Sequence, residues 1–351
     1  MSLHLRPVQF VDTPVTQPDG AVARLAGGLQ WFAAYEVIEA GHRRTVPVAE
    51  VATLGDPAVR LHAAITKPRP PLQLGARTLR LDQPLVAGIL NVTPDSFSDG
   101  GRHGDDPAAA AAAGVDMAAA GAALIDLGGE STRPGAAQVW EGDEIARVVP
   151  VVERLARSGT PVSIDTRKAA VMEAALAAGA HIVNDVSALL WDERALDVVA
   201  RAQCPVVLMH SPDPKEGGHA RTGYRDVLTE VFDWLDARIA AVVAAGIDQS
   251  RIIVDPGIGF GKTLAENLAL INGLALFHGL GCPIMLGASR KRMIGALDNE
   301  APVEARLGGS LALALKGAEA GVQLLRVHDV AATVQALRIW RGLRDRALVG
   351  G

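Results

Sequence analysis

From residue 84 onward, hydrophobic and polar positions follow one repeating pattern. A short apolar run, often rich in β-branched residues, ends in polar residues and is followed by an amphipathic or alanine-rich stretch. The runs cover residues 85–90, 122–127, 161–165, 180–184, 205–209, 251–255, 283–287 and 323–327. Runs that are short and continuously apolar are typical of strands buried on both faces of a parallel sheet.

The segments between these runs carry helix signals. Asp105, Asp106 and Pro107 form an acidic start with an early proline, which predicts a helix over 108–120. Residues 222–245 carry apolar side chains at helical spacing and end at Gly246. Eight strand–helix units over about 265 residues match the size of a (β/α)8 TIM barrel, the α/β fold that we predict. A doubly wound open sheet is the alternative, although we find no dinucleotide glycine fingerprint.

The leading residues do not follow this pattern. They contain an aromatic cluster, Trp31, Phe32 and Tyr35, but no group of polar residues that suggests chemistry. Residues 67–71, KPRPP, are a stiff connector, and 72–81 alternates around a Gly-Ala-Arg turn like a hairpin. We expect an N-terminal extension over 1–66, a small docked α/β element of unknown role. A linker and hairpin over 67–83 would close the N-terminal mouth of a barrel over 84–351.

Composition narrows the function classes. Lys plus Arg number 34 and Asp plus Glu 39, a net charge of −5, so no broad basic face for nucleic acid is expected. Two cysteines cannot build a disulfide framework. The first residues do not resemble a signal peptide, and the alanine-rich run is too weakly hydrophobic to span a bilayer. We expect a cytoplasmic protein without a membrane partner.

Polar residues gather where the predicted strands end. All eight runs are followed by charged or hydrogen-bonding groups, whereas their opposite ends carry mostly Pro, Ala and Gly. In TIM barrels the chemistry lies on the loops after the carboxyl ends of the strands. The asymmetry therefore predicts an enzyme.

Two sets of side chains indicate what binds there. Asp165, Asn184 and Asp255 follow different strands, and such acceptors suit a flat heterocycle that presents several N–H donors. Buried carboxylates need a cation, which Lys291 can supply.

The second set is cationic. Arg326 and His328 project from one face of a strand, and Arg133 lies in a loop rich in Gly and Pro, which favours a phosphate or pyrophosphate site. Asn91 and Asp95 are oxygen donors suited to Mg²⁺. One pocket thus joins a heterocycle to a diphosphate leaving group.

The strand-end motifs resemble those of the dihydropteroate synthase family. The longest are GILNVTPDSFSDGG at 88–101 and DLGGESTRPG at 126–135; shorter ones lie at 163–166, 184–185, 255–262, 289–291 and 326–330. They occur in the family's order, and the resemblance covers about residues 72–345. The resemblance implies that 6-hydroxymethyl-7,8-dihydropterin diphosphate condenses with 4-aminobenzoate to give 7,8-dihydropteroate and pyrophosphate. It also implies a homodimer.

Carried over by motif, the resemblance implies roles for single residues. The pterin would be held by Asp165, Asn184, Asp255 and Lys291, and the diphosphate by Thr132, Arg326 and His328. Asn91 would ligate Mg²⁺. The aminobenzoate pocket would comprise Thr132, Pro134, Phe260 and Lys291, with Phe97 closing over it.

Two features depart from the family: the leading residues exceed the usual length, and the wording at 211–216 differs. For Asp126, Asp185 and His210, functional and structural roles both stay open. Two rival functions remain, a pterin-binding methyltransferase and a non-catalytic pterin-binding homologue.

Overall fold

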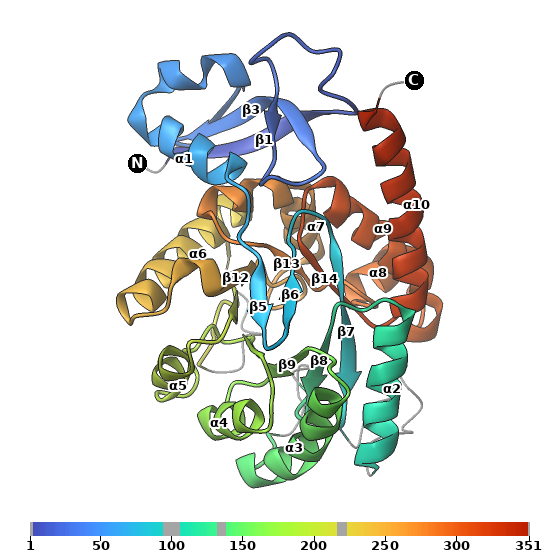
Figure 1. The fold of residues 1–351 in the computed structure, drawn as a ribbon. Coiled ribbons are helices and arrows are strands. Elements are labelled where there is room, and N and C mark those ends of the chain that lie inside the picture. The colour runs from blue at the N-terminus through green and yellow to red at the C-terminus, as the bar shows by residue number, and fades with distance from the viewer. Residues whose placement is uncertain (1–2, 94–105, 132–137, 216–222, 350–351) are drawn as a thin grey trace.

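The computed structural model describes residues 3–93, 106–131, 138–215 and 223–349. Its centre is an eight-stranded parallel sheet in the order β12-β11-β10-β9-β8-β7-β14-β13 (Figure 1). The strands are β7 (Leu85–Asn91), β8 (Leu124–Gly128), β9 (Val162–Asp165), β10 (Ile182–Asp185), β11 (Val206–Met209), β12 (Ile252–Asp255), β13 (Met285–Leu286) and β14 (Leu324–Val327). A parallel bridge between Val254 and Ile284 joins the two outer strands and closes the barrel. The predicted TIM barrel is confirmed, and the doubly wound alternative is wrong.

Helices surround the barrel (Figure 1). They are α2 (Pro107–Ala120), α3 (Glu141–Arg157), α4 (Ala169–Ala177), α5 (Ala195–Ala202), α6 (Val227–Ala244), α7 (Leu264–Asn272), α8 (Arg292–Leu297), α9 (Leu307–Glu319) and α10 (Val330–Leu348). Short 3-10 helices are η1 (Val48–Leu54), η3 (Gln249–Arg251), η4 (Leu274–Leu280) and η5 (Val303–Ala305). Asp106 caps α2 as its sequence predicts. The helix predicted from residue 222 begins later, because the Asp226 side chain accepts the N–H groups of Leu228 and Thr229 and so fixes its start.

Residues 3–66 form an antiparallel sheet with helices on one side. The strands are β1 (Leu3–Val11), β2 (Ala23–Arg24), β3 (Trp31–Glu39) and β4 (His42–Pro47), followed by η1 and α1 (Asp56–Thr66). Phe32 and Tyr35 lie in their own buried cluster. The sheet sits at one end of the barrel (Figure 1), where β1 and α1 contact η4. His4 also lies 2.7 Å from Asp233 on α6.

A hairpin of β5 (Leu72–Leu74) and β6 (Arg77–Leu79) follows. Leu72, Leu74 and Leu81 pack in one buried cluster with residues near the start of the barrel strands, among them Leu124 and Leu324. The hairpin therefore fills the N-terminal mouth of the barrel and leaves its other end for a site. In the part of the chain that the structure describes, no helix is long and apolar enough to cross a membrane.

Candidate active site

Inside the barrel, a layer of polar side chains follows the apolar layer that packs against the hairpin. Since side chains two residues apart on a strand point to the same face, every second residue of a barrel strand enters the interior. The buried cluster with the hairpin includes Leu124, Ile182, Ile253 and Leu324. Two residues further along the same strands stand Asp126, Asn184, Asp255 and Arg326. Each of these four comes from a different alternate strand, so their side chains share one layer.

Arg326 binds two carboxylates of this region, Asp126 and Asp165. Its Nε lies 2.5 Å from Asp126 Oδ2, and its Nη2 lies 2.5 Å from Asp165 Oδ2. Asn184 Nδ2 donates to the same Asp126 oxygen at 3.0 Å. The sequence placed Arg326 with the phosphate set and Asp165 with the heterocycle set, whereas the structure brings the two together.

Asp126, for which the sequence left functional and structural roles open, holds other polar side chains in place. It is completely buried and caps no helix; it accepts hydrogen bonds from Asn184 and Arg326. Among the described residues, its Oδ1 has no hydrogen-bond partner. The sequence could have indicated this role, because an Asp inside a strand that is buried on both faces is rare unless it is paired.

Asp255 and Lys291 form the opposite side of the layer. Asp255 Oδ1 accepts the N–H of Gly257 at 2.7 Å. Lys291 Nζ donates to the carbonyl of Ile258 and lies 4.6 Å from the centre of the Phe260 ring. Asp255, expected at the pterin, and Phe260, expected at the aminobenzoate, therefore both lie near Lys291, which was expected at both, beyond the ends of β12 and β13.

Gly287 lies between Asp255 and Arg326. A Cβ built there would lie 3.6 Å from Asp255 Oδ2 and 3.9 Å from Arg326 Cδ. Asp255 and Arg326 thus border the same small space, which a larger residue would narrow. The ends of β12, β13 and β14 therefore face one another, and the bond between Arg326 and Asp165 adds the end of β9 to this rim.

Burial and charge together set the protonation of this rim. Burial raises the pKa of Asp165 to about 7; Arg326 opposes this rise, and Asp126 adds to it. Burial also raises the pKa of Asp255, against the effect of Lys291. Burial lowers the pKa of Lys291 to about 8, although Asp255 raises it. For Arg326, burial alone would lower the pKa, but Asp126 and Asp165 raise it above its usual range, so it is a fixed cation.

Asn91 lies beside Asp165 at the end of β7. A Cβ at Gly128 would lie 3.3 Å from Asn91 Oδ1 and 3.8 Å from Asp165 Oδ2, so both oxygens face one glycine. Among the described residues, no three His, Cys, Asp or Glu side chains gather as a metal site. One amide oxygen with room beside it suits Mg²⁺, which typically takes one or two protein ligands and completes its shell with water and phosphate oxygens.

The loops after β13 and β14 interlock. Ser289 Oγ lies 3.1 Å from His328 Nδ1 and accepts the backbone N–H of His328 at 3.2 Å. Arg290 binds Asp329 through two nitrogens, with Nε 2.9 Å from Oδ2 and Nη2 2.5 Å from Oδ1. These bonds fix His328 relative to the loop that carries Lys291.

Five expected site residues lie outside the described residues: Asp95, Phe97, Thr132, Arg133 and Pro134.

Asp185 and His210 support loops in the described structure. Asp185 is buried and accepts the N–H groups of Ser187 at 2.7 Å and Leu189 at 2.9 Å. The His210 ring packs against Trp234 at 5.0 Å, and burial lowers its pKa to about 2, so it stays neutral. Sequence reasoning could not separate these roles because both residues end buried strands.

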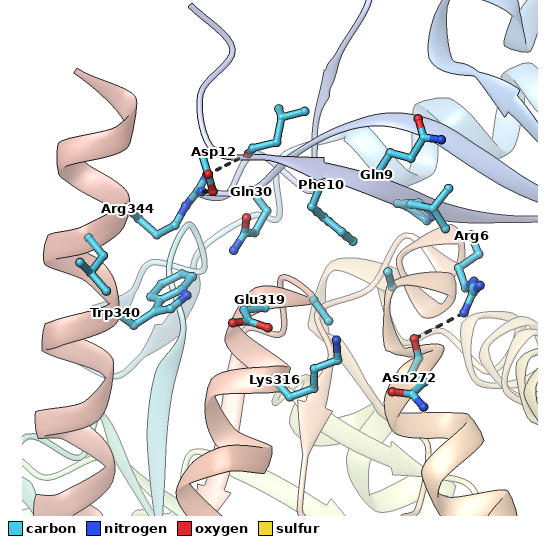
Figure 2. Close-up of a pocket in the computed structure, with 16 residues that line it drawn as sticks. Arg6, Gln9, Phe10, Asp12, Gln30, Asn272, Lys316, Glu319, Trp340 and Arg344 are labelled. Atoms are coloured by element: carbon cyan, nitrogen blue, oxygen red, sulfur yellow. Dashed lines mark hydrogen bonds and ion pairs between the residues drawn. The ribbon is translucent and has the colours of Figure 1, made fainter. Parts of the chain in front are cut away.

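A cavity of about 480 Å³ lies elsewhere, between β1 and helices α9 and α10 (Figure 2). Its charged residues are partly matched: Arg6 donates to the carbonyl of Asn272 at 3.5 Å, and Arg344 lies 3.4 Å from Asp12. None of the strand-end residues lines it. This cavity is not the candidate site, because the titratable groups with perturbed pKa values that suit chemistry lie at the barrel rim.

Comparison with known proteins gives consistent matches. Residues 87–328 match the sequence model of a family described as pterin binding enzyme. The chain is 45% identical over 276 residues to a dihydropteroate synthase of Neisseria meningitidis serogroup B, covering 77% of this chain and 96% of that protein. It is 46% identical over 263 residues to that of Escherichia coli K12, covering 75% and 92%.

Solved structures agree. The chain is similar to Xanthomonas albilineans dihydropteroate synthase with 4-aminobenzoic acid, with a TM-score of 0.74 and 50% identity, covering 79% of this chain and 99% of that chain. For the complex of that enzyme with 7,8-dihydropteroate, the TM-score is 0.71 and the identity 48%, with 79% and 100% covered.

Proposed function

The chain belongs to the dihydropteroate synthase family of pterin-binding enzymes, and from this premise we propose how its own residues carry out the reaction. It is a transferase of folate biosynthesis. It condenses 6-hydroxymethyl-7,8-dihydropterin diphosphate with 4-aminobenzoate and forms 7,8-dihydropteroate and pyrophosphate.

The polar layer supports the assignment of the pterin site. Asp165, Asn184 and Asp255 would accept the N–H groups of the pterin ring, and Lys291 would contact its acceptor edge. The observation that carries the proposal is the convergence of these side chains with Arg326 on one rim. Asp126 is a positioning residue in this scheme, since it holds Asn184 and Arg326 in register.

Bond cleavage would lead. The C–O bond between the exocyclic methylene and the diphosphate breaks, and the electron pair leaves with the diphosphate. Positive charge then develops on the pterin, where the carboxylates of Asp165 and Asp255 stabilise it inside a buried, low-dielectric site. The neutral arylamine nitrogen attacks the methylene carbon, forms the C–N bond and afterwards loses one proton, so it needs positioning more than deprotonation.

Arg326 on β14 and His328, directly after that strand, would hold the leaving group. Arg326 is charged throughout the working pH range, because Asp126 and Asp165 raise its pKa. Thr132 and Arg133 would join them from the loop after β8. Asn91, with Asp95, would hold Mg²⁺, which when bound neutralises charge on the diphosphate oxygens.

Phe260 and Lys291 would form the wall of the aminobenzoate site. The Lys291 ammonium lies over the Phe260 ring, an arrangement that fixes both side chains at the rim. Phe97, Thr132 and Pro134 would complete this pocket. The 4-aminobenzoate would then lie beside the pterin, with its amine toward the methylene carbon.

We extend the proposal to the rest of the chain. Residues 1–66 would be a docked extension, 67–83 a linker and a hairpin closing one mouth, and 84–351 the catalytic barrel, as the separate buried clusters suggest.

Ile339 and Leu343, one turn apart on α10, are 66% and 69% exposed, which suits self-association as a homodimer. Sedimentation over a concentration series tests this, and a monomer at all concentrations contradicts it. A cytoplasmic location is part of the proposal.

Pyrophosphate release that depends on 4-aminobenzoate tests the function. A pterin-binding methyltransferase would release none, and a non-catalytic homologue would bind pterin without turnover. The presence of Ser289, Lys291, Arg326 and His328 favours the synthase over both rivals. Pterin binding without pyrophosphate release would overturn the proposed reaction.

A further inference from the structure

The loop after β12 is held by the side chain of Lys262, a residue that has no role in the reaction described above. Its Nζ donates to the carbonyl of Gly257 at 2.8 Å and to that of Phe260 at 3.1 Å. A third carbonyl, that of His210 directly after β11, lies 3.5 Å from the same nitrogen. The side chain therefore turns back onto its own loop and connects this loop to the neighbouring strand end.

Asn267 on α7 holds the middle of the same loop. It is 4% exposed, and its Oδ1 accepts the backbone N–H of Gly259 at 2.6 Å. Its Nδ2 donates to the carbonyl groups of Lys262 at 3.1 Å and Thr263 at 2.7 Å. Two side chains thus fix the conformation of this loop, one from the helix that follows it and one from within it.

Lys291 packs along the part of the loop that Lys262 fixes. Lys291 Nζ donates to the carbonyl of Ile258 and lies 4.6 Å from the centre of the Phe260 ring. Gly259 has a φ of +84°, and a Cβ there would lie 2.9 Å from Lys291 Cδ, so a glycine is needed for this close approach. Lys291 therefore contacts residues 258–260, and Lys262 binds the carbonyls of residues 257 and 260.

These hydrogen bonds determine where the Phe260 ring lies. Gly257 is buried, and a buried carbonyl that loses its donor is costly. Without the amino group of Lys262, the loop must shift until the freed carbonyls reach water or another donor. One of these carbonyls belongs to Phe260 itself, so such a shift moves the ring away from Lys291.

We propose that Lys262 is a positioning residue that fixes the Phe260 ring against Lys291 and thereby determines how well the enzyme binds 4-aminobenzoate. The inference rests on the proposed function, in which Phe260 and Lys291 form a wall of the aminobenzoate site. The acceptors proposed for the pterin stand at the ends of the barrel strands β9, β10 and β12. Loosening the loop therefore weakens binding of the arylamine much more than binding of the pterin.

Lys262→Met tests this, because methionine has a similar length and no N–H donor. The KM for 4-aminobenzoate is expected to rise about tenfold or more, the size of a lost charged hydrogen bond. The Kd of dihydropterin diphosphate, measured by calorimetry, is expected to stay within about threefold. Lys316→Met, at an exposed lysine of α9, is the matched control and is expected to leave both constants within about twofold. An unchanged KM, or equal losses for both substrates, overturns the inference.

A double-mutant cycle with Phe260→Leu shows whether Lys262 acts through the aromatic ring. Phe260→Leu removes the ring and is itself expected to raise the KM for 4-aminobenzoate. If Lys262 acts by placing that ring, Lys262→Met adds less than about threefold to the KM in the Phe260→Leu background. The same fold-change in both backgrounds shows that the two residues act independently and refutes the inference.

A matched loss of stability separates positioning from folding. Leu74→Ala, at the opposite end of the barrel, is expected to lower Tm and to leave the KM for 4-aminobenzoate unchanged. Lys262→Gln keeps two N–H donors and is expected to raise the KM less than Lys262→Met; it replaces that variant in the cycle if Lys262→Met does not fold. If the KM rises with falling Tm in every variant, Leu74→Ala included, Lys262 serves stability only and the inference is wrong. A wild-type protein without pyrophosphate release would instead refute the proposed function.

Discussion

Asp126→Asn perturbs the protonation of the site without changing its shape. Asp126 and Asp165 bind neighbouring nitrogens, Nε and Nη2, of the same Arg326 guanidinium. One cation cannot neutralise two carboxylates, and burial with the charge of Asp126 raises the pKa of Asp165. In the proposed mechanism Asp165 acts as an anion, so kcat/KM of the wild type falls as the pH drops through about 7.

The size of the effect follows from the repulsion between the two carboxylates. Two unit charges about 5 Å apart at an effective dielectric constant of 20 repel by about 3 kcal/mol. Removing the charge of Asp126 relieves this repulsion and makes Asp165 easier to ionise. Allowing for partial screening, the midpoint of the acidic limb is expected to move to lower pH by about one unit or more.

The assay is the initial rate of pyrophosphate release at a subsaturating concentration of the pterin substrate, measured from about pH 5 to 9. Asp143→Asn, at an exposed position on α3, controls for the loss of one carboxylate. A limb that stays in place or moves to higher pH in Asp126→Asn refutes the shared-guanidinium reasoning. A wild-type profile that is flat through neutral pH refutes the requirement for ionised Asp165.

Four further changes test other parts of the structure. Asp165→Asn is expected to lower kcat more than about tenfold, equivalent to ~1.4 kcal/mol of barrier, in the pyrophosphate assay; a smaller loss contradicts its electrostatic role. Gly257→Ala is expected to reduce the free energy of unfolding by about 1–3 kcal/mol in urea titrations, because φ is +70° and the new Cβ would lie 1.9 Å from the carbonyl oxygen of His210. Leu74→Ala is expected to lower the free energy of unfolding by about 2–5 kcal/mol and to leave kcat unchanged, since Leu74 packs at the end of the barrel opposite the site. A fall in kcat would contradict this separation between the hairpin and the site. Chelation of divalent metal is expected to lower turnover, and added Mg²⁺ is expected to restore it. The Asn91→Ala variant is expected to need a higher Mg²⁺ concentration for half-maximal turnover; an unchanged concentration argues against Asn91 as a ligand.

The strands were predictable because burial on both faces makes most of their residues apolar, which gives short apolar runs in the sequence. Each of the eight apolar runs overlaps one strand, and several contain it completely, for example Val162–Asp165 within 161–165. Boundaries were less certain where a cap decides them, as at Asp226, because a capping side chain is as polar as the loop before it. A small docked α/β element was expected over residues 1–66, but its antiparallel strands were not placed, since β1 and β3 combine buried positions on one face with partly exposed ones and share no motif.

The pairing inside the site was not predictable from motifs but follows from barrel geometry. Motifs assign each residue to a ligand, and so separated Arg326 from Asp165. Geometry assigns each residue to a layer: counting two positions on from Leu124, Ile182, Ile253 and Leu324 gives two carboxylates, one amide and one guanidinium. Once the barrel closes, these groups must satisfy one another or a ligand, because an unpaired buried charge is costly. Arg326 therefore binds Asp126 within the layer and reaches Asp165 on the neighbouring strand. In the proposed scheme, a pterin that brings its own N–H donors replaces the bond to Asp165, while Asp126 keeps Arg326 in place.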